Sequence, residues 1–418
     1  MRLTASTPRP NAGTVTLANA YPARDSARDP GSGGGSSGGF SALGSPPSPD
    51  AQRTALLYEG RLGELYRIFL VNLLLTFLTG GLYRFWAKTR LRRYLWSHTS
   101  LSGDRFEYTG TGAEMFFGFV IVMVFIVLAQ IGMYALAIGS QPGDPIFTVV
   151  QFCGGTIILY ITFVAQYAAQ RYRLTRTLWR GISGGMTGSA WVWGLKGMFF
   201  SVLSLLTMTL AWPWAQMRLV DDRINNSFFG DAKASAHTSS KSLYVAYLVG
   251  LVIAAVLSVV AISIISGLIG LMVTKLGLPD QLNLDPANKL KIPPELIGII
   301  LLGAVAFFFA FWTITIVAFS FYQAAMIREI AAKLSLGGLR FATSVTAGAL
   351  MRRIFGNIFI VLVTLGFGIP IAIHRTMRFI VTNVEVVGNV DGSEISRAHL
   401  KRPRMGEGLL EAFDPGFL

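Results

Sequence analysis

Four long apolar segments, each free of Asp, Glu, Lys, Arg and His, constrain what this chain can fold into. They cover residues 115–139, 146–169, 243–273 and 296–327. Each is longer than the ~20 helical residues that cross a bilayer core. The chain is 52% hydrophobic and only 14% charged, which lies outside the range of soluble domains. The sequence therefore predicts an all-α fold, that of a polytopic helical membrane protein.

The composition of the two ends differs from that of the middle. Residues 1–52 contain "DPGSGGGSSGGF" and "GSPPSPD", which cannot bury enough apolar surface to fold. We expect 1–52 to be a disordered cytoplasmic tail, 55–400 to be the membrane domain and 401–418 to be a C-terminal tail. The formal net charge of +14 fits basic residues that flank membrane helices and contact anionic headgroups better than it fits nucleic-acid binding.

Three stretches of the chain resemble one another: "TGGLYRFWAKTRLRRYLWSHTSLSG", "TMTLAWPWAQMRLVDDRINNSFFG" and "TLGFGIPIAIHRTMRFIVTNVEVVG". They predict three repeated broken-helix units, 58–110, 186–235 and 345–392, which alternate with two long transmembrane helix pairs, 115–169 and 243–327. The three stretches align on one alanine each (Ala87, Ala215 and Ala372), and each ends with a glycine (Gly103, Gly230 and Gly388). The other aligned positions are Thr79, Thr207 and Thr364, then Arg90, Arg218 and Arg375, and finally His98, Asn226 and Asn383.

Basic residues flank each unit on both sides, which indicates that both flanks are cytoplasmic. We expect each unit to enter the membrane from the cytoplasm, turn, and return. Gly and Pro mark the turns, at Thr79-Gly80-Gly81, at Pro213 and at Gly366 to Pro370, since both residue types interrupt helices. The alternative is seven ordinary crossings, three of which violate the charge bias. Both terminal tails are expected to be cytoplasmic.

The first unit resembles the YjgN family of bacterial inner-membrane proteins, a domain of unknown function. The matching residues are Gly63-Glu64-Leu65-Tyr66, Trp86-Ala87, Arg90, Arg93-Tyr94, Thr99, Gly103 and the Phe106, Tyr108, Gly110 ending. Two positions depart from the family pattern. Phe85 stands where Pro usually precedes the Trp-Ala pair, and His98 stands where Asn is usual. The resemblance covers about residues 55 to 400 and implies an inner-membrane location, helical architecture and no known activity.

No motif of catalytic chemistry is present: HExxH, GxSxG, P-loop and dinucleotide fingerprints are all missing. We therefore expect no enzymatic activity, no cofactor and no metal site. His98 could neighbour Glu107 or Asp104, but an isolated interfacial His is more often structural. Cys153, within an apolar segment, is the single cysteine of the sequence, so no intrachain disulfide can form. Small residues in the long helices allow close packing, either within the bundle or in a homo-oligomer.

Two functions from different classes remain. The first is a transporter or channel-like protein for a small anionic solute, with Arg90, Arg218 and Arg375 near the helix breaks. The alternative is a non-transporting membrane scaffold that binds anionic lipid and partner proteins. The sequence favours transport. The arrangement of the three arginines decides between them, because a solute path requires that they converge on one cavity. The threonines and the His and Asn positions of the repeat are further candidates for ligand or lipid contact.

Overall fold

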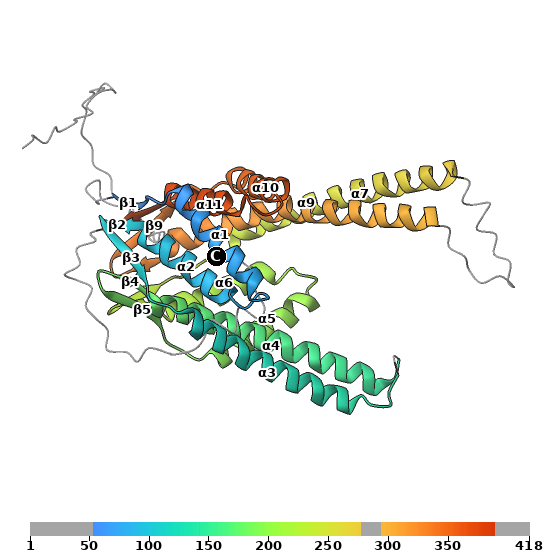
Figure 1. Ribbon diagram of the computed structural model, residues 1–418, viewed down its shortest axis with the longest axis horizontal. Coiled ribbons are helices and arrows are strands. Elements are labelled where there is room, and N and C mark those ends of the chain that lie inside the picture. The colour runs from blue at the N-terminus through green and yellow to red at the C-terminus, as the bar shows by residue number, and fades with distance from the viewer. Residues whose placement is uncertain (1–52, 142, 277–293, 389–418) are drawn as a thin grey trace, which may run out of the picture. The chain divides into compact units, whose positions relative to one another are not determined.

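The computed structural model describes residues 53–141, 143–276 and 294–388 (Figure 1), so both expected tails lie outside the described residues. Along the described chain the order β-α-α-β occurs five times in succession. The first unit is β1 (Arg53–Tyr58), α1 (Leu62–Leu78), α2 (Arg84–Ser97) and β2 (Thr99–Leu101). The second is β3 (Asp104–Tyr108), α3 (Gly112–Leu136), α4 (Pro145–Arg176) and β4 (Thr177–Trp179).

The remaining three units continue the same order. The third is β5 (Ile182–Met186), α5 (Ala190–Leu206), α6 (Trp212–Asn225) and β6 (Ser227–Phe229). The fourth is β7 (Ala232–Ser235), α7 (Lys241–Lys275), α9 (Pro294–Lys333) and β8 (Ser335–Leu336). The fifth is β9 (Leu339–Thr343), α10 (Ala347–Val363), α11 (Ile369–Asn383) and β10 (Val384–Val387). Units one, three and five therefore carry short helices, and units two and four carry long ones.

The expected all-α fold is wrong, because the strands form a closed antiparallel barrel. Each strand pairs with its neighbours in chain order, and β1 pairs with β10 to close the ring, with Ala55 opposite Glu385. The strands are two to six residues long, too short for an alternating pattern to be recognised. Their turns carry the clearer signal. Ser102-Gly103, Arg180-Gly181 and Gly337-Gly338 all have positive φ at both positions, as in type I′ hairpins.

Apolar side chains fill the interior of the barrel. Trp179, Leu339 and Val386 are buried at its centre. Because the side chains packed around them come from strands all around the ring, their meeting point lies inside it. These are Leu101, Phe106, Ile182, Phe229, Ala232 and Phe341. The barrel is therefore a packed core and not a pore.

All five helical hairpins leave the same edge of the barrel. Every odd-numbered strand runs into a helix and every even-numbered strand follows one, and neighbouring strands are antiparallel. The ends that connect to helices therefore lie at one edge, the helix rim. The tight turns between units, such as Ser102-Gly103, lie at the opposite edge.

Within the part of the chain that the structure describes, the long hairpins carry four helices that are long and apolar enough to cross a membrane. These are α3, α4, α7 and α9, with mean hydropathies of 2.6, 1.9, 3.0 and 2.4. Figure 1 shows α3 beside α4 and α7 beside α9 as antiparallel pairs. At most 17% of each apolar window is buried, so most of this apolar surface faces outward, as it does in lipid.

The three short hairpins turn with the same backbone geometry, although their sequences differ. Two consecutive residues have positive φ in each: Gly80-Gly81, Met208-Thr209 and Leu365-Gly366. The amide of the second of these residues donates to the carbonyl five residues before it, at 2.6 to 2.8 Å. The break expected at Pro213 is therefore misplaced. It lies at residues 207–211, and Pro213 sits in the first turn of α6, where proline is tolerated.

Replacing Thr209 by Gly should stabilise the protein. A β-branched residue at φ 68° is strained by about 1 kcal/mol, and Gly adopts this backbone without strain. We expect a higher melting temperature for the detergent-purified T209G variant. Ser201→Gly, in the middle of α5, is the matched control and should lower it. An unchanged or lower value for T209G would show that the turn is not strained.

Candidate functional site

The repeated threonines lock the turns of the short hairpins. The hydroxyls of Thr79, Thr207 and Thr364 accept from the amide four residues later, at 2.9, 3.0 and 2.6 Å. Each hydroxyl also donates to the carbonyl four residues earlier. These contacts satisfy backbone groups that helix ends leave free. They give the threonines a structural role at the turn.

The His and Asn positions of the repeat join the second helix of each short hairpin to the barrel. The carbonyls of His98, Asn226 and Asn383 accept from the first residue after an odd-numbered strand, at 2.9, 2.8 and 3.2 Å. Asn226 Nδ2 donates to the Asp222 carbonyl at 2.7 Å, and Asn383 Nδ2 makes the equivalent bond at 2.8 Å.

His98 reproduces the asparagine contact, which explains how it can stand at a position where Asn is usual. Its Nδ1 lies 2.8 Å from the Tyr94 carbonyl, and because a carbonyl only accepts, Nδ1 carries the proton. The other ring nitrogen faces the Glu64 carboxylate at 3.5 Å. The partner of His98 is therefore Glu64, and not the Glu107 or Asp104 that sequence proximity indicated.

Two of the three repeat arginines are exposed, and the third packs against a neighbouring helix. Arg90 and Arg218 are exposed on α2 and α6. The Arg218 guanidinium lies 5.9 Å from the centre of the Trp214 ring. Arg375 is half-buried, and its guanidinium packs against α10 so closely that a Cβ at Gly356 would lie 2.9 Å from it.

Sequence reasoning missed two asparagines that bridge the arms of the short hairpins. Asn72 Nδ2 donates to the carbonyl of Ala87 at 3.2 Å, and Asn357 Nδ2 donates to that of Ala372 at 3.3 Å. Both lie fifteen residues before the alanine on which the units align, so extending the alignment upstream would have found them. In the third unit Phe200 occupies this position and packs on Trp214, with ring centres 5.2 Å apart.

A buried polar cluster lies where α2, β3, α3 and α4 meet at the helix rim. Glu114 bonds with both Arg176 and the hydroxyl of Tyr172. Arg92 is 3% exposed, and its Nη1 lies 3.4 Å from the Tyr108 hydroxyl. Burial raises the pKa of Tyr108, and nearby arginines oppose the shift, so this phenol is protonated at neutral pH. Lys88 is also buried.

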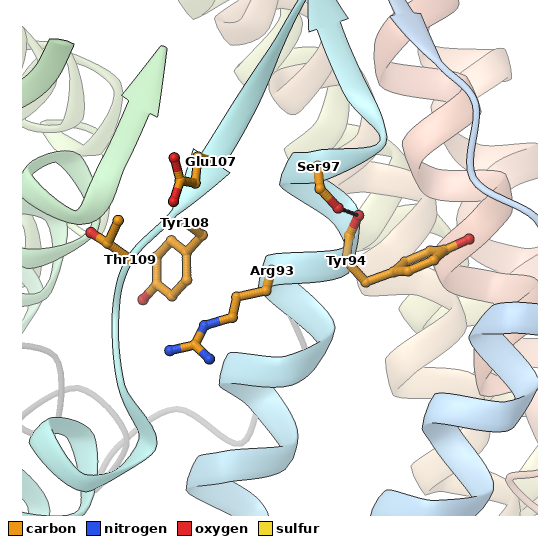
Figure 2. Close-up of a pocket in the computed structure, with 6 residues that line it drawn as sticks. All are labelled: Arg93, Tyr94, Ser97, Glu107, Tyr108 and Thr109. Carbon is orange, nitrogen blue, oxygen red and sulfur yellow. Dashed lines mark hydrogen bonds between the residues drawn. The ribbon is translucent and has the colours of Figure 1, made fainter. Parts of the chain in front are cut away.

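A cavity of 490 Å³ adjoins this cluster, between α2 and the end of β3 (Figure 2). Figure 2 shows the Arg93 side chain extending from α2 toward the Tyr108 ring, with Glu107 on the facing strand β3 and Thr109 directly after it. Its polar lining consists of one guanidinium, one carboxylate and several hydroxyls. The lining residues are Arg93, Tyr94, Ser97, Glu107, Tyr108 and Thr109. This cavity lies within the size range of small-molecule sites.

A family model described as "Bacterial protein of unknown function (DUF898)" matches residues 53–412. The chain belongs to this family. It is similar to the inner membrane protein YjgN of Salmonella typhimurium, with 24% identity over 84% of this chain and 92% of the relative. YjgN of Escherichia coli O157:H7 is 33% identical over 18% of this chain and 19% of its own length. No solved structure matches significantly. The chain is thus a membrane protein of the DUF898, or YjgN, family.

Removing the positive charge of Arg176 should destabilise this protein. Arg176 and Glu114 are 13% and 27% exposed, so Arg176→Gln leaves a largely buried carboxylate without its cation, at a cost of about 2–3 kcal/mol. Denaturant titration of the detergent-purified protein measures this. Adding Glu114→Gln should recover part of the loss.

The matched control is Arg105→Gln, which breaks an exposed ion pair with Glu59 and should change the free energy of unfolding by less than about 0.5 kcal/mol. Equal losses for Arg176→Gln and Arg105→Gln would contradict the importance of the buried pair.

Proposed function

We propose that this DUF898-family protein is a non-transporting scaffold of the bacterial inner membrane, whose basic short hairpins bind anionic lipid headgroups. The observation that carries the proposal is the exposure of Arg90 and Arg218 on two different helices, while Arg375 packs against α10. A path for an anionic solute needs these charges around one cavity, and two of them are instead exposed on different helices. The packed barrel supports the same conclusion, because Trp179 and its neighbours leave no aqueous passage along that axis.

The proposed membrane placement follows from the common helix rim. The barrel lies at the cytoplasmic face, and the two long hairpins each cross the bilayer twice. The short hairpins enter from the same face and return to it. Their helices of 14 and 17 residues, α2 and α1, are roughly 21 and 26 Å long, less than the ~30 Å hydrocarbon core.

The tips of the short hairpins support this re-entrant placement. The turns at residues 79–83, 207–211 and 364–368 contain no charged residue. At or beside these turns, the apolar side chains of Phe77, Met208 and Leu365 are 83%, 86% and 89% exposed. Side chains of this kind are stable in hydrocarbon. Within hydrocarbon, backbone N–H and C=O groups need hydrogen-bond partners from the protein. The threonine hydroxyls provide such partners for backbone amides at these turns.

The basic arms of the hairpins then lie near the headgroups. Arg90 is exposed on the returning helix α2, and Arg218 lies on α6 beside Trp214. Arg with Trp is the combination found at membrane interfaces, where the cation meets phosphate and the ring lies at headgroup depth. Each cation near an anionic leaflet contributes about 1 kcal/mol of attraction.

A second candidate function is transport of a small anion between the helices. The observation that favours it is the burial of Lys88 and Arg92, since cations buried within membrane proteins often mark a solute path. Proteoliposomes loaded with chloride or phosphate separate the two proposals. Anion flux that exceeds that of empty liposomes and is lost in Arg92→Gln would establish transport and overturn the scaffold.

Impermeant thiol labelling in intact cells should show that the short hairpins do not reach the periplasm. In a Cys153→Ser background, a cysteine at Gln141, between α3 and α4, should label from outside. Cysteines at Met208 and Leu365 should label neither in intact nor in permeabilised cells, because hydrocarbon covers them. A cysteine at Ser102, on the far edge of the barrel, should label only after permeabilisation. Outside labelling of 208 or 365 would mean that the short hairpins cross.

Removing the repeat arginines should release anionic lipid. Native mass spectrometry of the detergent-purified protein should show several-fold less bound phosphatidylglycerol after combined Arg90→Gln, Arg218→Gln and Arg375→Gln substitution. The matched control is Arg105→Gln, an exposed arginine of β3 whose partner is Glu59. Retention of the lipid by the triple variant would contradict the proposal.

A further inference from the structure

The cavity between α2 and β3 carries chemistry that the scaffold proposal does not use. It combines a guanidinium with a carboxylate and hydroxyls in one polar recess. We propose that this cavity binds a phosphoethanolamine group, that is, a phosphate ester that carries a primary ammonium.

Arg93 holds the phosphate end of the ligand. Its Nη2 donates to the Gly110 carbonyl at 2.8 Å, which fixes the orientation of the guanidinium at the cavity wall. An arginine has five N–H donors, so further donors remain for a phosphate oxygen. The charged contact between guanidinium and phosphate is stronger than a neutral hydrogen bond and suits the planar geometry of arginine.

Three acceptors hold the ammonium end. The Ser97 hydroxyl donates its proton to the Tyr94 carbonyl at 3.0 Å, and the Thr109 hydroxyl donates to the Arg176 carbonyl at 3.2 Å. The Ser97 oxygen also accepts from the protonated Nδ1 of His98 at 3.2 Å. Because a hydroxyl oxygen has two lone pairs, each of the two oxygens can still accept one hydrogen bond from the cavity. Glu107 is exposed and makes no ion pair with any residue in the described part of the chain.

A primary ammonium matches this set because it has three N–H donors. A trimethylammonium group has none and leaves the acceptors unpaired. The charges also balance, since one guanidinium and one carboxylate face a ligand with one charge of each sign. A purely anionic headgroup could pair with Arg93 but would leave the Glu107 carboxylate without a cation.

The position of the cavity favours a lipid as the source of this group. The cavity lies where α2 ends and α3 is about to begin, at the helix rim. In the proposed membrane placement, this rim lies at headgroup depth. The inference rests on that placement and is independent of the scaffold role.

The test uses the full-length protein, stripped of lipid in detergent. Affinities for dioctanoyl phosphatidylethanolamine, phosphatidylcholine and phosphatidylglycerol are measured by native mass spectrometry. We expect phosphatidylethanolamine to bind about tenfold more tightly than phosphatidylcholine. Glu107→Gln should abolish this preference, and Arg93→Gln should weaken the binding of both lipids. Soluble glycerophosphoethanolamine separates the sources: competition shows that the headgroup suffices, and its failure to compete assigns the site to the lipid.

Arg90→Gln is the matched control, three residues before Arg93 on the same helix. It should reduce phosphatidylglycerol binding and leave the preference for phosphatidylethanolamine unchanged, so failure of the scaffold proposal is distinguishable from failure of this one. The melting temperature of each variant verifies folding, and Ser97→Ala provides a milder second variant. Equal affinities of the wild-type protein for phosphatidylethanolamine and phosphatidylcholine, or a preference that persists in Glu107→Gln, would overturn the assignment.

Discussion

The pairing of β1 with β10 is the constraint on which the rest of this structure depends. It joins Ala55 to Glu385 and turns a row of short strands into a ring. An open sheet of strands this short would expose two unpaired edges and little buried surface. Closure removes both edges and creates an interior that Trp179, Leu339 and Val386 fill. The antiparallel ring also places the start of every helical hairpin at the same edge of the barrel, the helix rim.

The β-α-α-β unit thus occurs in two forms that differ in the length of their helices. In units two and four the helices reach 25 to 40 residues, enough for a bilayer. In units one, three and five they stop at 14 to 17 residues, and a threonine closes the turn. At each hairpin tip the threonine hydroxyl pairs with backbone groups only four residues away, and at the tip between α5 and α6 the Thr209 carbonyl also accepts from the Tyr247 hydroxyl of α7.

The membrane character and the short hairpins could be predicted from sequence because their signals are long and local. Charge-free apolar segments identify the long helices, and the Gly and Pro residues located two of the three turns. The barrel could not be predicted, since strands as short as Ser335–Leu336 give no periodicity and β1 and β10 are far apart in sequence. The glycine at the end of the first sequence repeat, Gly103, lies in the tight turn between β2 and β3. Asn72 and Asn357 lay upstream of the aligned stretches.

The closure of the ring by the first and last strands also sets an order of assembly. β10 begins at Val384, so the barrel cannot close until almost all of the described chain has been synthesised. The helical hairpins rely on local contacts and can form as they emerge, whereas a pairing of such high sequence separation is slow. Until it forms, β1 and β9 expose unpaired edges at which other chains can add strands. The ring therefore closes late, and only in a chain that already contains β10.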